Sequence, residues 1–384
     1  MTIMIDTDRT DEQQALVDAV RDFARRECGT REQRDALTDH GRHPHNPDLY
    51  AKVAELGWLG VAIPEAYGGS GGGMVDLMLF LEETAYGQVP IGGFSVSMIS
   101  GGPVERFGSE EQKEEILGGI ATGSVESVAM SEPEAGSDVG NLKCRAVRDG
   151  GGYVVNGQKT WISEAQYAKH ILLVCRSDAS SSKHEGLTML SIPADTPGIE
   201  IRGIETMGGE VVNDVFFTDV EVPADALVGT EGAAWPQLMT GLNSERLIIA
   251  GLMLGTARRT FDDLIAYVTE REQFGRPIGS FQALRHRIAD LATEIECCRL
   301  LTYDVARKVD ENPGAMFARE ASMAKLKVTE TAKRVALEGM QMMGGYGYAT
   351  EYDMQGHVRT TLVSTIYGGT SEIQREIIGK TYGL

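Results

Sequence analysis

The sequence is short of basic residues. Its 384 residues include 36 Lys and Arg against 56 Asp and Glu, a formal net charge of −20. Nucleic acids and anionic membrane surfaces are both bound through Lys and Arg, so this charge argues against either partner. The charged fraction of 24% and the hydrophobic fraction of 42% are ordinary for a globular protein. They exclude a disordered chain, a collagen and a coiled-coil rod.

Cysteines and long apolar runs are also scarce. The five cysteines are scattered and form no CxxC pair, so we expect reduced thiols in a cytoplasmic protein. The longest strongly apolar run, residues 247–257, is too short to span a bilayer, and the uncharged stretch 84–104 is interrupted by glycine and proline. The first residues are acidic and lack the apolar core of a signal peptide. We therefore expect no integral membrane segment.

Several common cofactor and catalytic motifs are missing. No GxGxxG follows an expected strand, and GxxxxGK[ST], HExxH and GxSxG do not occur. The glycines of residues 68–73 follow no strand either, so we interpret them as a loop. His40, His43 and His45 cluster in a proline-containing loop. No zinc ligand set of known spacing completes this group, so no metal site is predicted.

Three segments with different hydrophobic periods follow one another, in line with about 150 residues per domain. Residues 1–122 read as helical, with capping boxes at Thr10–Gln13 and Ser109–Gln112. Residues 123–230 contain short runs of β character between turn signals. Residues 231–384 return to long helical stretches, at 236–271, 281–310, 315–345 and 371–380, which indicate a bundle.

The middle segment predicts an antiparallel barrel or sandwich. Asn156–Gly157 separates two β runs and predicts a two-residue hairpin turn. Turns rather than helices also separate the later runs, at 170–175, 187–192, 199–204 and 215–222. This spacing disfavours βαβ units. The predicted fold class is therefore α+β, with an N-terminal helical domain, a middle β domain and a C-terminal helical domain.

One carboxylate lies on an apolar helix face. Positions 238, 242, 245, 249 and 252 share a face of the expected helix and carry Leu, Leu, Glu245, Ile and Leu. An unpaired carboxylate in such a place has a raised pKa and suits proton abstraction near neutral pH. The alternative is a structural ion pair with Arg246 or with an arginine elsewhere.

Six short motifs resemble those of the acyl-CoA dehydrogenases. Two of them, MSEPEAGSD at 130–138 and NGQKTWIS at 156–163, resemble the flavin-facing β domain of that family. The others keep the family's order and spacing over nearly the whole chain: PEAYGG at 64–69, REQFGR at 271–276, QMMGGYG at 341–347 and IYGGTSEI at 366–373.

The resemblance implies a fold, a cofactor and a reaction. Members have an N-terminal helical domain, a middle β domain and a C-terminal four-helix bundle, bind FAD, and are usually homotetramers built as dimers of dimers. They oxidise an acyl-CoA thioester to the trans-2-enoyl-CoA. A base takes the α-proton, FAD N5 takes the hydride from the β-carbon, and electrons pass to an electron-transfer flavoprotein.

The resemblance also assigns roles to individual residues. Near the substrate it places Ser137 by the CoA arm, with Arg246, Tyr367 and Gly368 around the thioester. At the cofactor it places Arg271 on the FAD pyrophosphate. Met130, Ser131, Trp161 and Ser163 face the flavin ring, while some of the remaining FAD contacts come from a neighbouring subunit. Those remaining residues are Phe274, Gln282, Gln341, Gly344, Gly345, Thr370 and Glu372.

The position of the base departs from many members. They carry the catalytic Glu directly after the Tyr of an Ile-Tyr-x-Gly-Thr motif, where this sequence has Gly368. Isovaleryl-CoA and long-chain acyl-CoA dehydrogenases instead place the Glu before an Arg on the first bundle helix, as Glu245–Arg246 does. We therefore expect Glu245 to be the base. Two alternatives stay open: an oxidase- or monooxygenase-like flavoenzyme reoxidised by oxygen, and one subunit of a heteromeric dehydrogenase.

Overall fold

The computed structural model describes residues 9–181 and 183–383, without the side chains of Leu242 and Asn243. The predicted place of the Leu242 side chain on the stripe of Glu245 therefore lies outside the described residues. The described chain forms two compact units. We call residues 9–41, 73–89 and 245–383 the bundle unit, and residues 42–72, 90–181 and 183–244 the sheet unit. The expected domain boundaries after residues 122 and 230 stay a prediction.

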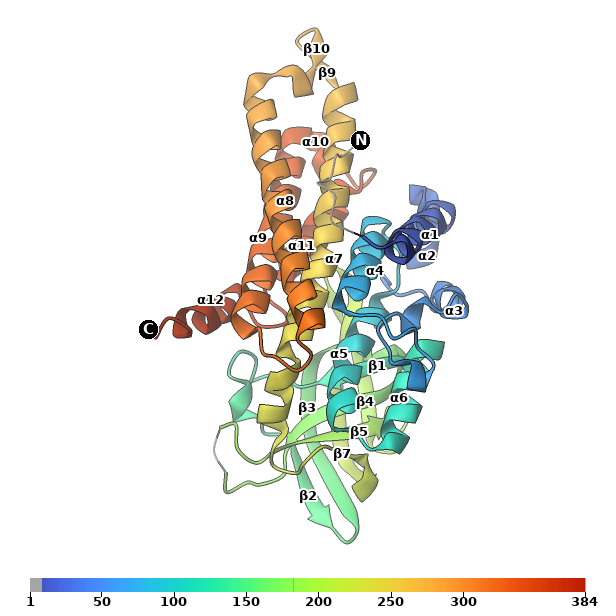
Figure 1. Cartoon of the computed structure of the whole chain (residues 1–384), viewed down its shortest axis with the longest axis vertical. Helices are drawn as coiled ribbons and strands as arrows, with labels where there is room; N and C mark the ends of the chain where they lie inside the picture. Colours follow the sequence, from blue (N-terminus) through green and yellow to red (C-terminus); the bar gives the residue numbers. More distant parts are fainter. Residues whose placement is uncertain (1–8, 182, 384) are drawn as a thin grey trace. The chain divides into compact units, whose positions relative to one another are not determined.

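The bundle unit is built from long helices (Figure 1). α9 contacts α8, α11 and α12, while α4 contacts α1 and α8. A short hairpin of β9 (Glu272–Gln273) and β10 (Arg276–Pro277) joins the two longest helices. The helices are α1 (Asp11–Cys28), α2 (Arg31–Thr38), α4 (Met74–Tyr86), α7 (Ala234–Glu270, starting in the sheet unit), α8 (Gln282–Glu311), α9 (Ala318–Met343), α10 (Gly345–Tyr348), α11 (Met354–Ser364) and α12 (Ser371–Lys380).

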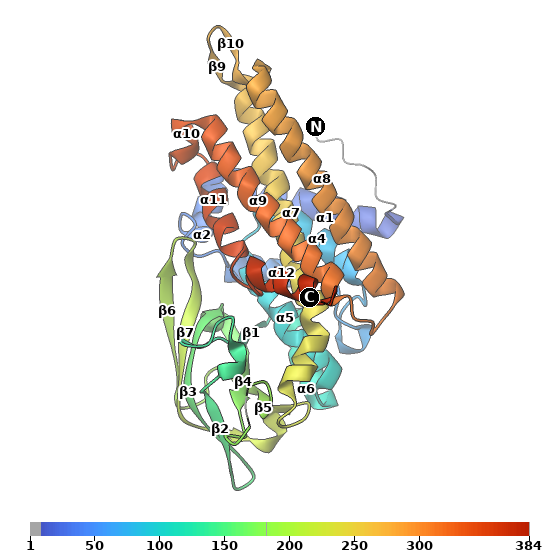
Figure 2. The ribbon, with the colours of Figure 1, turned by 90° about the vertical axis from the view of Figure 1, so that its left-hand side faces the viewer.

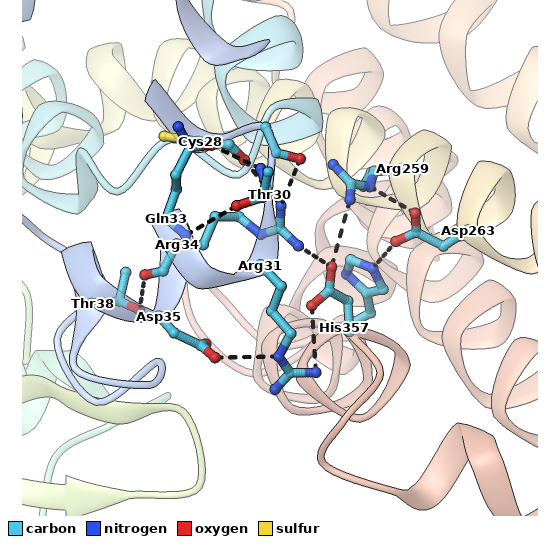
Figure 3. Close-up of polar contacts among 12 residues, drawn as sticks. Cys28, Thr30, Arg31, Gln33, Arg34, Asp35, Thr38, Arg259, Asp263 and His357 are labelled. Atoms are coloured by element: carbon cyan, nitrogen blue, oxygen red, sulfur yellow. Dashed lines mark hydrogen bonds and ion pairs between the residues drawn. The ribbon is translucent and has the colours of Figure 1, made fainter. Parts of the chain in front are cut away.

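Polar contacts join α1 and α2 to α7 and α11. The buried Arg34 donates to the Cys28 carbonyl oxygen over 3.0 Å and to the Asp353 carboxylate. His357 and Arg259 each lie 2.8 Å from the Asp263 carboxylate. Figure 3 shows these side chains around Asp263. The carboxylates of Asp353 and Asp263 therefore both have a guanidinium or imidazole partner, which offsets the cost of burying them.

A second buried network lies between α1, α4, α7 and α8. Glu82 and Glu83 on α4 are each 1% exposed. Arg258 on α7 donates to both, at 3.1 Å from Glu83 Oε1, and Arg21 binds Glu83 through two contacts of 2.8 Å. The Tyr303 hydroxyl donates to Glu82. Two adjacent buried carboxylates are tolerated here because two guanidinium groups face them.

Replacing Arg258 by Met is expected to lower the free energy of unfolding by about 3 kcal/mol, because Glu82 and Glu83 lose a shared cation in a buried place. Urea denaturation followed by circular dichroism measures this. The matched control is Arg375→Met, which breaks the exposed pair of Arg375 and Glu330. That change is expected to cost less than about 1 kcal/mol. Equal effects of both substitutions would contradict the prediction.

The sheet unit combines three helices with an eight-stranded sheet. The helices are α3 (Pro47–Glu55), α5 (Gly92–Phe107) and α6 (Glu110–Thr122). The strands are β1 (Val125–Ala129), β2 (Arg145–Asp149), β3 (Gly152–Ser163), β4 (Ala168–Arg176), β5 (Leu187–Pro193), β6 (Ile199–Thr206), β7 (Gly209–Pro223) and β8 (Leu227–Val228). Their order is β6-β7-β3-β2-β4-β5-β8, and β1 pairs with β4 (Figure 2).

Most strand pairs are antiparallel, as expected, but two are not. β1 pairs with β4 in parallel, and so does β2 at the single pair Arg145–Arg176. Parallel neighbours need a long connection rather than a tight turn. Here the β2–β3 hairpin lies between β1 and β4 in the chain and supplies that length.

The predicted hairpin turn at Asn156–Gly157 is wrong. β3 runs without a break from Gly152 to Ser163, and the turn between β2 and β3 lies at 149–152 instead. Gly157 forms an irregularity in the β3–β7 ladder. A Cβ at this position would lie 2.6 Å from the Cys144 Cα. The glycine therefore allows close contact between two backbones rather than a chain reversal.

The capping boxes expected before the first and last helices of the N-terminal segment are confirmed. The Thr10 hydroxyl accepts from the Gln13 N–H at 3.2 Å, and the Ser109 hydroxyl accepts from the Gln112 N–H at 3.3 Å. In both cases the Gln side chain accepts from the backbone N–H of the capping residue. Among the described helices, none has both the length and the apolar character required to cross a bilayer.

Candidate functional site

The turn between α11 and α12 in the bundle unit requires glycine. α11 ends at Ser364, and Thr370 caps α12 by accepting from the Ile373 N–H at 3.3 Å. Between them, Gly368 has φ +60° and Gly369 has φ +78°. Both values lie in the left-handed region that glycine adopts without a steric penalty. The sequence Gly-Gly-Thr therefore makes a tight turn directly before a helix.

Glu245 on α7 lies against this turn. A Cβ at Gly368 would be 3.6 Å from Glu245 Oε1 and only 2.1 Å from the Cδ1 atom of Ile249. A side chain at position 368 is therefore excluded by Ile249 as well as by the backbone conformation. The carboxyl group that borders this turn in the present chain comes from α7, one helical turn before Ile249.

Two buried side chains hold the carbonyl groups of the turn. Lys325 Nζ on α9 donates to the Gly369 oxygen at 2.8 Å, and Gln374 Nε2 on α12 lies 3.0 Å from the Gly368 and Gly369 oxygens. Within the described residues, the N–H groups of Gly368 and Gly369 donate to no protein acceptor. The turn thus presents two free donors beside a carboxyl group.

Burial and nearby charges act on Glu245 in opposite directions. Burial raises the pKa of the Glu245 carboxyl, while the positive charges of Arg246 and Lys325 lower it. Burial also lowers the pKa of Arg246, which is 4% exposed. Glu245 makes no ion pair with any described residue. Its environment is therefore that of a proton acceptor rather than of a structural salt bridge.

In the sheet unit, β3 and the loop after β1 carry the residues expected to face the flavin. Trp161 has φ +62° and is 59% exposed, so β3 presents a flat aromatic surface outward. Ser163 follows on the same strand and is half-buried. Met130 and Ser131 lie at the end of β1, where the Ser131 oxygen accepts from the Thr160 N–H at 3.0 Å.

A buried ion pair fixes that loop. Lys159 is fully buried and donates to the Met130 oxygen at 2.9 Å and to Glu132 Oε1 at 2.7 Å. Glu132 also accepts from the N–H groups of Lys143 and Cys144 at 2.7 and 2.9 Å. Sequence reasoning missed Lys159 and Glu132, although both lie inside the two motifs that resemble the flavin-facing domain. The available signal was Lys159, the one charged residue of the β3 sequence.

Glu164, directly after Ser163, was also missed. It is 1% exposed and has φ +53°, a conformation uncommon for a side chain other than Gly, Asn or Asp. Its Oε1 has no hydrogen-bond partner among the described residues, and burial raises the pKa of the carboxyl to about 8. No described residue forms an ion pair with Glu164, so burial favours the protonated form of its carboxyl.

A second group of predicted residues lies at the end of the bundle marked by the β9–β10 hairpin, far from α12 (Figures 1 and 2). The Arg271 guanidinium lies 5.3 Å from the centre of the Tyr346 ring. This contact joins the start of the hairpin to the α9–α10 junction. Phe274 is 93% exposed. Arg271 also borders a pocket of about 440 Å³. This group further includes the exposed residues Gln282, Gln341, Gly344 and Gly345.

The structure thus gathers the predicted residues into separate groups. Glu245, Arg246, Tyr367 and Gly368 lie around the α11–α12 turn, which continues into Thr370 and Glu372. Arg271, Phe274 and Gln341 lie at the other end of the same bundle. Ser137 is an exposed residue of the sheet unit, before a short helical turn at Val139–Asn141. The sharing of FAD contacts between neighbouring subunits stays a prediction.

Comparison with known proteins identifies the family. Models of the acyl-CoA dehydrogenase N-terminal, middle and C-terminal domains match residues 10–124, 127–220 and 232–383. A probable acyl-CoA dehydrogenase of Bacillus subtilis is 36% identical over 377 residues, 97% of this chain and 98% of that protein. Subunit CarC of the caffeyl-CoA reductase-Etf complex of Acetobacterium woodii is 34% identical over 364 residues, 93% of this chain and 94% of that one.

The solved structures agree. An acyl-CoA dehydrogenase from Geobacillus kaustophilus matches with a TM-score of 0.91 at 34% identity, over 99% of this chain and 100% of that one. The predicted fold class and family resemblance are therefore confirmed. FAD is the cofactor of this family, and the residues fit it: Trp161 offers an open aromatic face, and nothing lies within 4 Å of a Cβ placed at Gly344 or Gly345. The chain belongs to the acyl-CoA dehydrogenase family of FAD-dependent oxidoreductases.

Proposed function

We propose that this enzyme removes the α-proton of an acyl-CoA thioester with Glu245 and forms the trans-2-enoyl-CoA. The observation that carries the proposal is the place of the Glu245 carboxyl beside the Gly368–Gly369 turn, where a Cβ at Gly368 would lie 3.6 Å from Glu245 Oε1. At this turn Ile249 and the left-handed backbone exclude a side chain at position 368, so the base comes from α7. The raised pKa of Glu245 suits proton abstraction near neutral pH.

The proposed proton abstraction uses two kinds of group at the turn: the Glu245 carboxyl and the backbone N–H groups. A proton next to a thioester carbonyl is weakly acidic, and its removal places negative charge on the carbonyl oxygen. The free N–H of Gly368 is a suitable donor to that oxygen, because a preorganised backbone donor stabilises developing charge without reorganisation. When bound, FAD supplies the acceptor for the hydride that leaves the β-carbon. The positive charge of Arg246 acts on Glu245 from the next position on α7.

The electron acceptor we propose is an electron-transfer flavoprotein. The support is the 34% identity to a subunit of a complex whose name includes Etf. The homotetramer and the cytoplasmic location stay predictions. The acyl group that the enzyme accepts is best determined directly with a panel of thioesters.

That panel tests the proposed reaction. The FAD-loaded protein is mixed anaerobically with straight, branched and cyclic acyl-CoA thioesters, and the flavin absorbance near its visible maximum is recorded. We expect at least one thioester to bleach the flavin rapidly and to yield the enoyl-CoA by mass spectrometry. Release of hydrogen peroxide in air, at a rate equal to turnover, would support an oxidase instead. Bleaching by none of the thioesters would contradict the proposal.

A further inference from the structure

A buried lysine lies behind the Gly368–Gly369 turn without a carboxylate partner. Lys325 is among the largest fully buried side chains of the described chain. Its Nζ donates to the Gly369 oxygen at 2.8 Å, and it forms no ion pair with a described residue. Burying an ammonium group costs free energy unless it is paired with a carboxylate. A single carbonyl oxygen offsets this cost only in part.

Lys325 acts on both the Gly368–Gly369 turn and Glu245. Through its hydrogen bond it orients the Gly369 peptide, and together with Gln374 it turns the carbonyl groups of the turn inward. The N–H groups of Gly368 and Gly369 are thereby left free. Through its charge it favours the ionised form of Glu245, and Glu245 in turn favours the charged form of Lys325.

A pKa of about 8 favours the charged form of the Lys325 ammonium group at neutral pH. Burial lowers the pKa of Lys325 to about 8, and the negative charge of Glu245 opposes that shift. The other charged groups that act on this pair are Arg246 on α7, Glu330 on α9 and Glu372 on α12. Arg246 adds positive charge at Glu245, whereas the two acids support the ammonium.

We propose that Lys325 is a positioning residue for the reaction: it holds the Gly368–Gly369 turn as a donor of N–H groups and keeps Glu245 ionised. This inference rests on the proposed role of Glu245. It adds a residue that acts through the Gly368–Gly369 turn and through Glu245.

Three substitutions separate the two actions. Lys325→Met removes the charge and the donor, Lys325→Gln keeps a donor without the charge, and Lys325→Arg keeps the charge. The readouts are kcat, the pH dependence of kcat/KM, FAD content and the unfolding temperature. The matched control is Lys327→Met, two residues further along α9, where Lys327 pairs with Glu294 at the surface.

A neutral residue at position 325 raises the pKa of Glu245, so the acidic limb of kcat/KM moves to higher pH. We expect a move of about one pH unit in the Met and Gln variants and none in the Arg and control variants. Loss of the held turn is expected to lower kcat by on the order of 100-fold in the Met variant. FAD content stays at the level of the unmodified enzyme.

Two outcomes would overturn the inference. One is an acidic limb of kcat/KM that does not move in the Lys325→Gln variant. This variant is sufficient for the test if Lys325→Met does not fold. The other is a loss of activity that only follows the loss of folded protein. Full activity of Glu245→Gln would instead contradict the proposed function. The two failures are therefore distinguishable.

Discussion

Replacing Glu245 by Gln is expected to lower kcat by about 1,000-fold or more, with FAD still bound. A positioned general base contributes on the order of 10²–10⁴ in rate, and the amide of Gln cannot accept the α-proton. The amide has nearly the shape of the carboxyl, so the turn and Ile249 keep their contacts. The measurement is the rate of anaerobic flavin bleaching by the best thioester of the panel. The visible spectrum and the unfolding temperature serve as controls for cofactor and fold.

Moving the base to position 368 tests the geometry behind this expectation. The double variant Glu245→Gly, Gly368→Glu is expected to stay inactive, because a Cβ at position 368 would lie 2.1 Å from Ile249 Cδ1. Adding Ile249→Ala removes that clash and is expected to recover part of the lost rate, with Ile249→Ala alone as the control. Full activity of the double variant would show that position 368 has room for a side chain, contrary to the structure.

Glu245 could be singled out from the sequence because a charge interrupts an apolar helical stripe. The same signal exists for Lys325, which shares a face of α9 with the buried Ala321, Val328 and Ala332. It was missed because lysine is common in helices and its stem can cover apolar surface. What the sequence could not supply is the contact between α7, α9 and the turn after α11, since these residues lie 43 to 123 positions apart.

The fold was predictable where local signals were strong. The capping residues Thr10 and Ser109 mark helix starts, and the helices expected at 236–271 and 371–380 agree with α7 and α12 within a few residues. α11 was not predicted, because its short sequence contains several β-branched residues and Gly356. The Asn156–Gly157 prediction failed because tertiary contact with Cys144 decides the role of the glycine.

Replacing Glu164 by Gln is expected to stabilise the protein, and increasingly so at high pH. Burial raises the pKa of the Glu164 carboxyl from 4.5 to about 8. The folded state therefore binds this proton more tightly than the unfolded state, and stability is lost as the pH rises from 4.5 to 8. At about 1.36 kcal/mol per pKa unit, the loss reaches about 5 kcal/mol above pH 8. Gln has a similar shape and does not ionise, so it removes this loss.

The pH dependence distinguishes charge burial from other effects of the Glu164 substitution. Gln keeps the strained backbone conformation, so the gain is expected to be near zero at pH 4.5 and largest above pH 8 in urea denaturation. The control is Glu200→Gln, which removes an exposed carboxylate beside Arg202 on β6 and is expected to change stability by less than about 1 kcal/mol. A gain that is constant with pH would show that Glu164 is already ionised, or paired, in the folded protein.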